Sequence, residues 1–445
     1  MKIVNCKLPI VFYNGSMSKF QIILLSVFGF FIILAVMAFA LYRGGSGAQE
    51  ATVSVWGDIP AEDFNLFLNN TVQSRDQKLT LRYIEKAEES LDREFTEALA
   101  RGEGPDLLIT TQDKLWKEKS KLLAIPYGNV SVREFKQTFA EEGELFLAEE
   151  GVYGLPLSID PMVLYYNRDL LSAAGLAKPL GYWDEIYATI YKLTRRDGAG
   201  NLVESAIALG EARNIPHAKD ILSLLLLQAG TPVTGFIGDE LRSYLAANFD
   251  LTTSPGESAL EFYTQFSNPS KPYYSWNRTL PSAQTRFTSG DSTYYLGFAS
   301  ELSALRNKNP NLNFGVTLVP QSRVQGRTVT FGRLRALSIS RGTRNPAAAL
   351  SAALSLVSKE QVLALSEILN VPPARRDLLS LEPAGAEMPV FYEAALQAKG
   401  WLDPDDMRTR AIFGEMIEAV TSGRARAYEA LSAADRSLED AINKQ

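Results

Sequence analysis

The chain has 445 residues, of which 46% are hydrophobic and 22% are charged, a composition typical of globular proteins and a length sufficient for about two or three domains. The formal net charge is -6, and no run of Lys or Arg occurs, so the chain lacks the basic surface with which proteins track a phosphate backbone. These properties argue against a nucleic-acid partner.

The first distinctive segment is an uncharged apolar run over residues 22–42, and its length suits one helical crossing of a hydrocarbon layer about 30 Å thick. Three lysines precede this run and one arginine follows it closely, a bias typical of a cytoplasmic N-terminus and an exported body. The sequence therefore predicts a short cytoplasmic segment at 1–19, a transmembrane signal anchor at 20–43 and a single-pass protein of the plasma membrane with its main body on the extracytoplasmic side. The alternative is a cleaved signal peptide, because Ala38-Phe39-Ala40 has the small-residue pattern of a cleavage site.

Cysteine usage limits the chemistry of the exported body. Cys6 is the only cysteine and lies before the apolar run, so lipid attachment after that run is not available. The body therefore has neither disulfides nor a thiol nucleophile. A short Gly/Ser linker is expected at 44–50, where flexible chain would keep the body near the membrane.

Beyond this linker, strand and helix patterns alternate. Apolar and polar residues alternate at 52–55, and a second strand pattern follows at 78–84. Helical spacing of apolar residues predicts helices at 61–68 and 88–101, the second ended by two glycines. An apolar segment at 105–110 reads as a buried strand. This order predicts a mostly parallel sheet with helices on its faces.

In open sheets of this kind, ligands bind beyond the carboxyl ends of the strands. Three loops follow predicted strands at such ends, namely Trp56-Gly57-Asp58, residues 110–114 and residues 158–161. These loops are therefore the first candidates for a binding site.

Several segments resemble a known family of binding proteins, in the order in which that family carries them. They include FTEALARGEGPDLLITTQDKL (95–115), EEGVYGLPLSIDPMVLYYNRDLLSAAGL (149–176), RFTSGDSTYYLGFASEL (286–302), NFGVTLVPQ (313–321) and VPPARRD (371–377). From about residue 51 onward the chain is similar to the extracellular solute-binding proteins of the maltose-binding type, solute-binding family 1, which deliver ligands to ABC transporters.

This resemblance implies an α/β periplasmic-binding-protein-like fold of type II, whose two lobes close about a hinge on a ligand held in the cleft between them. It implies one lobe made of 51–159 and 321–365, and a second lobe made of 160–320 and 366–445. The implied function is a membrane-tethered receptor that captures a carbohydrate, expected to be an oligosaccharide, and delivers it to an ABC permease. The alternatives are another small solute, such as an acidic sugar, sugar phosphate, polyamine or peptide, and a sensor or scaffold without a transport role.

Five candidate ligand-binding residues belong to the first lobe or its edge. Asp160 lies where the chain leaves that lobe, and its carboxylate could accept hydrogen bonds from two sugar hydroxyls; the alternative is a turn acid before the following proline. Asp113 and Lys114 would meet the ligand from the loop after a buried strand, or else form a solvated turn pair. Trp56 and Asp58 follow the first strand, where Trp56 could equally belong to the core.

Five further candidates lie later in the chain. Tyr274 and Trp276 belong to an aromatic segment, and aromatic faces stack on pyranose rings; Trp276 could instead be structural. Phe298 stands where sugar-binding relatives often carry a tryptophan, and Arg335 stands near another such position. Arg333 and Arg335 could grip a carboxylate or phosphate through their guanidinium groups, or form surface ion pairs.

Catalysis and metal binding are not expected. His217 is the only histidine, so without a cysteine partner it cannot anchor a typical zinc site, and no Gly-x-Ser-x-Gly motif accompanies it. Residues 197–201 lack the spaced acids of a calcium loop and predict a hairpin turn. Asp113 and Asp160 leave glycoside hydrolysis as an alternative, since two carboxylates about 5 to 9 Å apart can carry it. The sequence thus favours a binding protein without cofactor or metal.

Overall fold

The computed structural model describes residues 51–69, 79–323, 326 and 328–444, together with short helical pieces within 19–32. The chain divides into two units, which end and begin at Ala51 and Thr52. The predicted linker at 44–50, nearly all of the predicted cytoplasmic segment and most of the predicted anchor lie outside the described residues. All the elements from α2 to α17 belong to the second unit.

Among the described residues, no single helix is both long and apolar enough to cross a membrane. One pair of helices, α12 (Pro346–Leu356) and α13 (Lys359–Leu369), meets the length and composition criteria jointly, but the two helices are bent by 67° relative to each other.

One large sheet organises the second unit. Eleven described strands belong to it, and eight of them follow the order β2-β1-β3-β14-β7-β12-β9-β8. Three shorter strands pair at its middle, β13 with β7, and β4 and β15 with β14. The strands are β1 (Ala51–Gly57), β2 (Leu79–Glu85), β3 (Leu107–Thr111), β4 (Leu122–Leu123), β7 (Leu155–Asn167), β8 (Arg195–Arg196), β9 (Leu202–Ile207), β12 (Ser292–Phe298), β13 (Phe314–Thr317), β14 (Thr330–Ser340) and β15 (Ala398–Lys399).

The beginning of the sheet confirms the elements expected from the sequence. The predicted strands and helices correspond to β1, α2 (Ala61–Phe67), β2, α3 (Glu88–Arg101) and β3. In α3, Leu91 and Phe95 are buried, and Gly102 ends the helix in the left-handed conformation with φ 71°. β1 and β3 are parallel, as expected, whereas β14 is antiparallel to both of its long neighbours, β3 and β7. β9 and β12 are also parallel, but β12 is antiparallel to β7 and β8 is antiparallel to β9. The expectation of a mostly parallel sheet is therefore wrong for the sheet as a whole, because long-range pairings bring in strands of the opposite direction.

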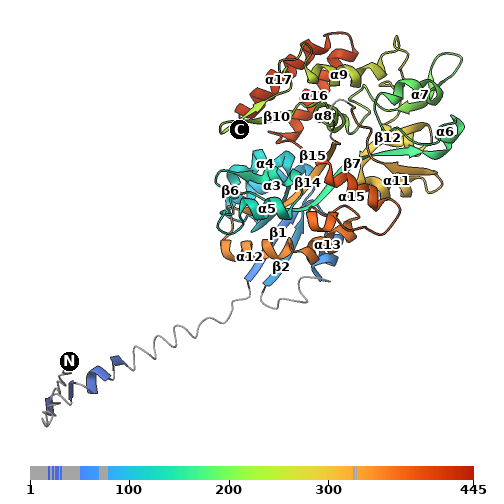
Figure 1. The fold of residues 1–445 in the computed structure, drawn as a ribbon. Helices are drawn as coiled ribbons and strands as arrows, with labels where there is room; N and C mark the ends of the chain where they lie inside the picture. Colours follow the sequence, from blue (N-terminus) through green and yellow to red (C-terminus); the bar gives the residue numbers. More distant parts are fainter. Residues whose placement is uncertain are drawn as a thin grey trace, which may run out of the picture. The chain divides into compact units, whose positions relative to one another are not determined.

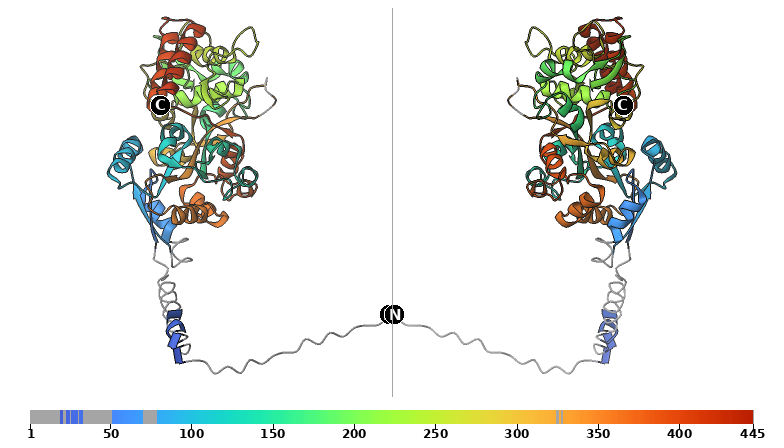
Figure 2. Two further views of the ribbon diagram at one scale, coloured as in Figure 1. Left: turned by 90° about the vertical axis from the view of Figure 1, so that its left-hand side faces the viewer. Right: turned by 90° about the vertical axis from the view of Figure 1, so that its right-hand side faces the viewer.

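β7 joins two lobes because its two halves pair with different partners. Its first half, up to Pro161, pairs with β14, and its second half, from Met162, pairs with β12 and β13. One core packs α2, α12 and α13 around β1 to β3. At the other end lie α8 (Ala218–Ala229), α9 (Pro255–Thr264), α16 (Asp406–Thr421) and α17 (Ala427–Asn443). Both views in Figure 2 show the red C-terminal helices at the end opposite the orange α12 and α13, as does Figure 1.

The chain near residue 373 lies with the first lobe. The backbone N–H of Ile159 donates to the carbonyl of Pro372 at 3.0 Å, and that of Ala374 donates to Leu157 at 3.0 Å. The next helix, α14 (Arg376–Leu379), packs against α5 (Val132–Thr138). These contacts place the start of 366–445 with the first lobe, whereas the expectation assigned all of that range to the second lobe. The sequence could not show this, because backbone pairing across more than 200 residues leaves no local pattern.

Candidate functional site

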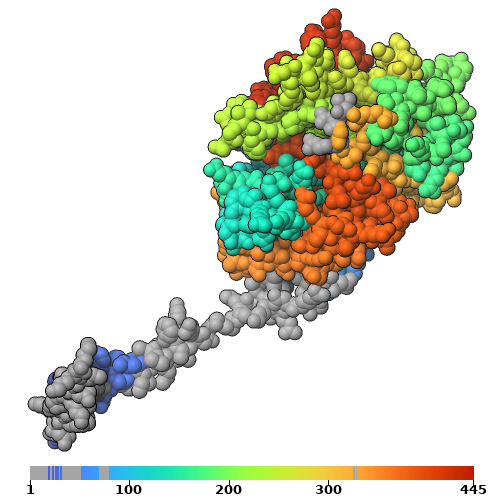
Figure 3. Space-filling view, in the orientation of Figure 1, coloured from blue at the N-terminus to red at the C-terminus, as the bar shows by residue number. Residues whose placement is uncertain are grey.

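A cleft of about 590 Å³ lies between the two lobes. Its first-lobe wall consists of α3 and α4 (Gln112–Glu118), and its second-lobe wall consists of the start of α16 with Asp405 before it. On the face shown in Figure 3, a gap separates the yellow-green surface of the second lobe from the teal surface of the first. Most of the residues that line the cleft are charged or polar, so the cavity offers hydrogen-bonding groups alongside the apolar stems of these side chains.

Asp113 and Lys114, two of the predicted ligand-binding residues, line this cleft. Both lie in the first turn of α4. The Thr111 hydroxyl donates a hydrogen bond to the Asp113 carboxylate, and the Lys114 ammonium donates to the carbonyl of Glu88 at 3.4 Å. Neither side chain has an ion-pair partner among the described residues within 4.0 Å, so both can still meet a polar ligand.

Asp58 and Arg335 form an ion pair at the edge of the first lobe. Nη2 of Arg335 lies 3.1 Å from Oδ2 of Asp58. Burial raises the pKa of the Asp58 carboxyl, but the neighbouring guanidinium outweighs burial and holds that pKa below its usual range. Asp58 is therefore ionised at neutral pH and already has a cationic partner.

Arg333 reaches the other lobe. Its Nη2 donates to Oδ2 of Asp220 in α8 at 2.6 Å, and its guanidinium carbon lies 4.0 Å above the ring of Phe298. Phe298 is 1% exposed. The aromatic face that the sequence analysis nominated for ligand stacking is thus covered by an arginine side chain.

His217 continues this charged cluster. Its Nε2 lies 2.8 Å from Oε1 of Glu301, and its Nδ1 lies 3.7 Å from Oδ2 of Asp220. Burial lowers the pKa of the imidazole, but the two carboxylates outweigh burial and raise that pKa to about 9. His217 is therefore a cation at neutral pH, held between two acids.

Asp160 has an internal partner. It is 5% exposed, and its two carboxylate oxygens accept hydrogen bonds from the backbone N–H and the hydroxyl of Ser300 at 2.9 and 2.6 Å. Burial raises the pKa of Asp160 although both hydrogen bonds oppose the rise. In this conformation Asp160 connects β7 to η5 (Ala299–Glu301) and is not among the residues that line the cleft.

Three nominated aromatic residues pack inside the protein or away from the cleft. Trp276 is 0% exposed, and its indole N–H donates to Oδ1 of Asn214 at 3.0 Å. Trp56 is 9% exposed and is covered by the ammonium of Lys86 at 4.3 Å from the ring centroid. Tyr274 stacks with Arg196 at 5.0 Å. The structure therefore does not bring Trp276 or Tyr274 to the cleft.

A set of paired charged residues at and behind the second-lobe wall was not predicted from the sequence. Lys219 is buried, and its ammonium lies 2.5 Å from a carboxylate oxygen of Asp403 and of Asp406. Lys117 of α4 contacts Asp405 at 3.0 Å and thereby joins the two walls. The acid-rich segment DPDD at 403–406 was the available signal, but its partners lie about 190 to 290 residues away in the chain.

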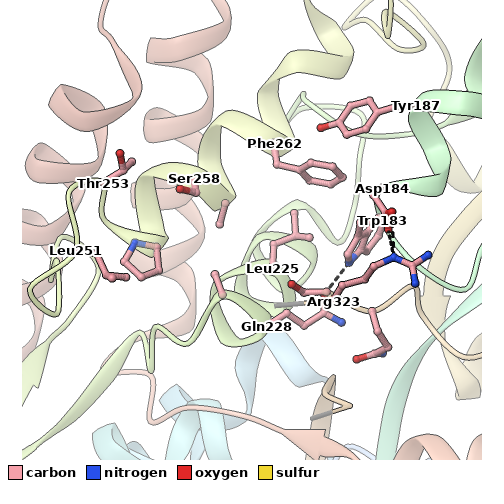
Figure 4. A pocket seen from close by; sticks show the side chains of 15 residues that line it. Trp183, Asp184, Tyr187, Leu225, Gln228, Leu251, Thr253, Ser258, Phe262 and Arg323 are labelled. Atoms are coloured by element: carbon pink, nitrogen blue, oxygen red, sulfur yellow. Dashed lines mark hydrogen bonds and ion pairs between the residues drawn. The ribbon is translucent and has the colours of Figure 1, made fainter. Parts of the chain in front are cut away.

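A second cavity, of about 540 Å³, lies within the second lobe between α8, α9 and α7 (Glu185–Leu193). Its floor contains Trp183, whose indole N–H donates to Oε1 of Gln228 at 2.6 Å. At its rim Arg323 pairs with Asp184 at 3.0 Å (Figure 4). These polar side chains hydrogen bond to one another. The surface that lines the cavity is therefore mainly apolar, with Phe262 on one side.

The described part of the chain holds no group of three or more His, Cys, Asp or Glu side chains arranged for a metal ion. The turn expected at 197–201 is present, where Oδ1 of Asp197 accepts from the backbone N–H of Ala199 and Asn201 at 2.9 and 2.8 Å. The Asp197 carboxylate of this turn therefore already accepts hydrogen bonds from backbone N–H groups.

Comparison with known proteins gives one family match and many structural matches. The family described as "Bacterial extracellular solute-binding protein" matches residues 72–390. A binding protein of Brucella abortus (strain 2308) is 29% identical over 124 residues, which cover 27% of this chain and 29% of that protein. The chain thus matches less than a third of the length of that relative.

Two solved structures extend the likeness over nearly the whole second unit. A cyclo/maltodextrin-binding protein complexed with maltotetraose has a TM-score of 0.71 at 17% identity, covering 88% of this chain and 98% of that chain. A cyclic alpha-maltosyl-1,6-maltose binding protein from Arthrobacter globiformis has a TM-score of 0.71 at 16% identity, covering 89% of this chain and 100% of that chain. Likeness at this level of identity establishes the two-lobed fold.

Proposed function

Because the chain belongs to the family of bacterial extracellular solute-binding proteins, we propose that it is an extracytoplasmic receptor which captures a saccharide between its lobes and delivers it to an ABC-type permease. The proteins of similar fold that bind maltotetraose or a cyclic maltosyl-maltose support a saccharide ligand. The observation that carries the proposal is that the cleft is lined by charged and polar residues, and that most basic side chains around it already pair with carboxylates of the protein itself.

Four basic side chains around the cleft already have carboxylate partners. Arg333 pairs with Asp220 and Arg335 with Asp58; Lys117 lies 3.0 Å from Asp405 and Arg410 lies 2.8 Å from Asp406. An anionic ligand would have to displace one of these acids or pair with Lys114 alone, and uncoupling the more buried Arg333–Asp220 pair is costly. A neutral polyhydroxyl ligand needs only hydrogen-bond donors and acceptors. The pairing therefore favours a sugar over an acidic sugar or a sugar phosphate.

Asp113 and Lys114 are the ligand contacts that this proposal assigns to the first lobe, because both line the cleft without an ion-pair partner among the described residues. The second lobe would meet the same ligand through the start of α16. A ligand that touches both walls binds the closed arrangement better than an open one, and this difference in affinity drives closure.

The proposal includes the membrane tether at 20–43 and the assignment of the body to the extracytoplasmic side, both supported by the uncharged run and by the flanking charges. It also includes a division of the body into a lobe of 51–159 with 321–365 and a lobe of 160–320 with the C-terminal helices. The contacts of α14 and Pro372 support adding 366–399 to the first of these lobes.

An enzyme is the less favoured function. Glycoside hydrolysis would need Asp113 and Asp160 to face one bond as acid and base or nucleophile. Both oxygens of Asp160 accept hydrogen bonds from Ser300, and the side chain is buried. This engagement argues against Asp160 as a group that meets substrate, and supports a binding role for the cleft.

A thermal-shift screen of the purified protein tests the proposal, using neutral oligosaccharides, acidic sugars, polyamines and short peptides. A ligand at a hundred times its dissociation constant adds about 2.7 kcal/mol of stability, so a sugar hit is expected as a clear rise in Tm. The rise should shrink in Asp113→Asn and persist in Glu382→Gln, an exposed acid away from the cleft lining. Hits confined to anions or peptides would contradict the sugar assignment, and silence in every class would favour a scaffold.

A further inference from the structure

Glu142 is a buried carboxyl without a hydrogen-bond partner. It lies in η3 (Glu141–Phe146) of the first lobe, is 2% exposed, and neither of its carboxyl oxygens has a partner among the described residues. Leaving a buried polar group unsatisfied is costly, and the cleft lining does not include this side chain.

Two glycines make room for the Glu142 carboxyl. A Cβ atom placed on Gly332 of β14 would collide with Oε2 of Glu142, and one placed on Gly400 would lie 2.7 Å from its Oε1. Any other residue at either position would push the carboxyl away. The two backbone segments therefore approach the carboxyl closely because they lack side chains there.

Both segments connect the lobes. Just before Gly332, the carbonyl of Val329 accepts from Nε2 of Gln228 in the second lobe at 2.8 Å. The carbonyl of Gly332 itself accepts from Nε2 of Gln112 in the first lobe at 2.9 Å. The chain is thus anchored to the second lobe at Val329 and to the first lobe at Gly332, with only two residues between them.

The segment at Gly400 makes the same transition. Lys399 pairs with Glu141 of the first lobe, and the indole N–H of Trp401 donates to Oγ of Ser223 in the second lobe at 3.1 Å. Gly400 lies between these two anchors. β14 and β15 are also hydrogen bonded to each other at this point, so Glu142 contacts both crossings where the backbone has to turn when the lobes move.

The surroundings of Glu142 disfavour its charge. Burial raises the pKa of this carboxyl to about 8; the ammonium of Lys399 opposes the rise and the carboxylate of Asp113 adds to it. Lys399 is already paired with Glu141, and the neighbouring Arg333 is paired with Asp220. A carboxylate formed in this position has no described hydrogen-bond donor, so ionisation favours any arrangement that admits water.

We propose that Glu142 is the proton-binding group of the hinge: the protonated carboxyl stabilises the described arrangement of the lobes, and loss of its proton favours separation of the two crossings and opening of the cleft. The receptor would then release its solute more readily at alkaline pH. This property goes beyond solute capture and does not depend on which solute is bound.

The test measures interlobe distance against pH. Cys6 is the only cysteine, so the full chain with Cys6→Ser, Leu66→Cys and Tyr428→Cys carries one spin label on each lobe at exposed positions of α2 and α17. Between pH 6.5 and 9, the distance distribution should shift to longer distances in this chain without ligand. The same shift should be absent in Glu142→Gln and in Glu142→Met, the second of which removes the need for hydrogen-bond partners.

Glu144→Gln is the matched control, because Glu144 lies in the same 3-10 helix but pairs with Lys136 at the surface; it should keep the shift. His217 also titrates in this range, and comparison with the Glu142 variants isolates Glu142 because all of them retain His217. An unchanged distance in the parent chain, or an equal shift in the Glu142 variants, would overturn the proposal. Loss of sugar binding would leave this result unaffected, so the two proposals fail separately.

Discussion

Arg333 and Arg335 lie two residues apart on β14, yet their guanidinium groups pair with carboxylates of opposite lobes, Asp220 at 2.6 Å and Asp58 at 3.1 Å. Residues at this spacing point to the same face of a strand. β14 is therefore fixed to both lobes by two neighbouring side chains on one face. Movement of one lobe against the other must strain or break one of these ion pairs.

The Asp58–Arg335 pair leads to a prediction about stability. Both side chains are largely buried, with 11% and 24% of their side-chain surface exposed. Replacing Arg335 by Met leaves the carboxylate of Asp58 without its cation and should lower the free energy of unfolding by about 2 to 3 kcal/mol. The double variant Asp58→Asn, Arg335→Met should recover at least half of this loss. Urea unfolding measures both values, and equal losses in the two variants would contradict the role assigned to the pair.

The cation at His217 leads to a prediction about pH. Its folded-state pKa of about 9 lies above the ordinary value of 6.5. A raised pKa of a basic group stabilises the folded state fully below the unfolded value, and this stabilisation is lost as the pH rises from about 6.5 through 9. The free energy of unfolding should therefore fall over this window by about 1 to 3 kcal/mol. In His217→Gln the fall should be smaller, and parallel curves for the two proteins would argue against a charged His217.

The two arginines also show what the sequence could and could not reveal. β1 to β3 were predictable because their patterns are local. Asp58 and Arg335 are 277 residues apart, and no pattern within either segment announces their contact. The covering of Phe298 by Arg333 is equally non-local, so an aromatic residue in a position suited to stacking was mistaken for an accessible one. Asp113 and Lys114, which line the cleft, could be nominated from the sequence because they follow a predictable strand directly.

Substitutions of Trp276 can distinguish a structural role of this residue from a role in ligand contact. The side chain is fully buried and its indole N–H is hydrogen bonded to Asn214. Trp276→Ala should lower the free energy of unfolding by about 3 to 5 kcal/mol, because a large cavity forms and Asn214 loses its donor. The milder Trp276→Phe should fold and bind any sugar found in the screen with unchanged affinity. A large loss of affinity in Trp276→Phe, measured by titration calorimetry, would restore the residue to the binding site.

A side chain at position 332 should destabilise the protein while Glu142 is present. A Cβ atom at this position would collide with the Glu142 carboxyl and lie 2.8 Å from Cβ of Ala398. Overpacking of this kind costs about 1 to 3 kcal/mol, so Gly332→Ala should be destabilised by that amount. Shortening the carboxyl in Gly332→Ala, Glu142→Ala removes the closer of the two collisions, and the double variant should be more stable than the sum of the single effects predicts. Equilibrium unfolding of the four proteins gives the coupling energy. A coupling near zero would mean that the carboxyl does not occupy the space between the two crossings, which would remove the geometric basis for a proton-linked hinge.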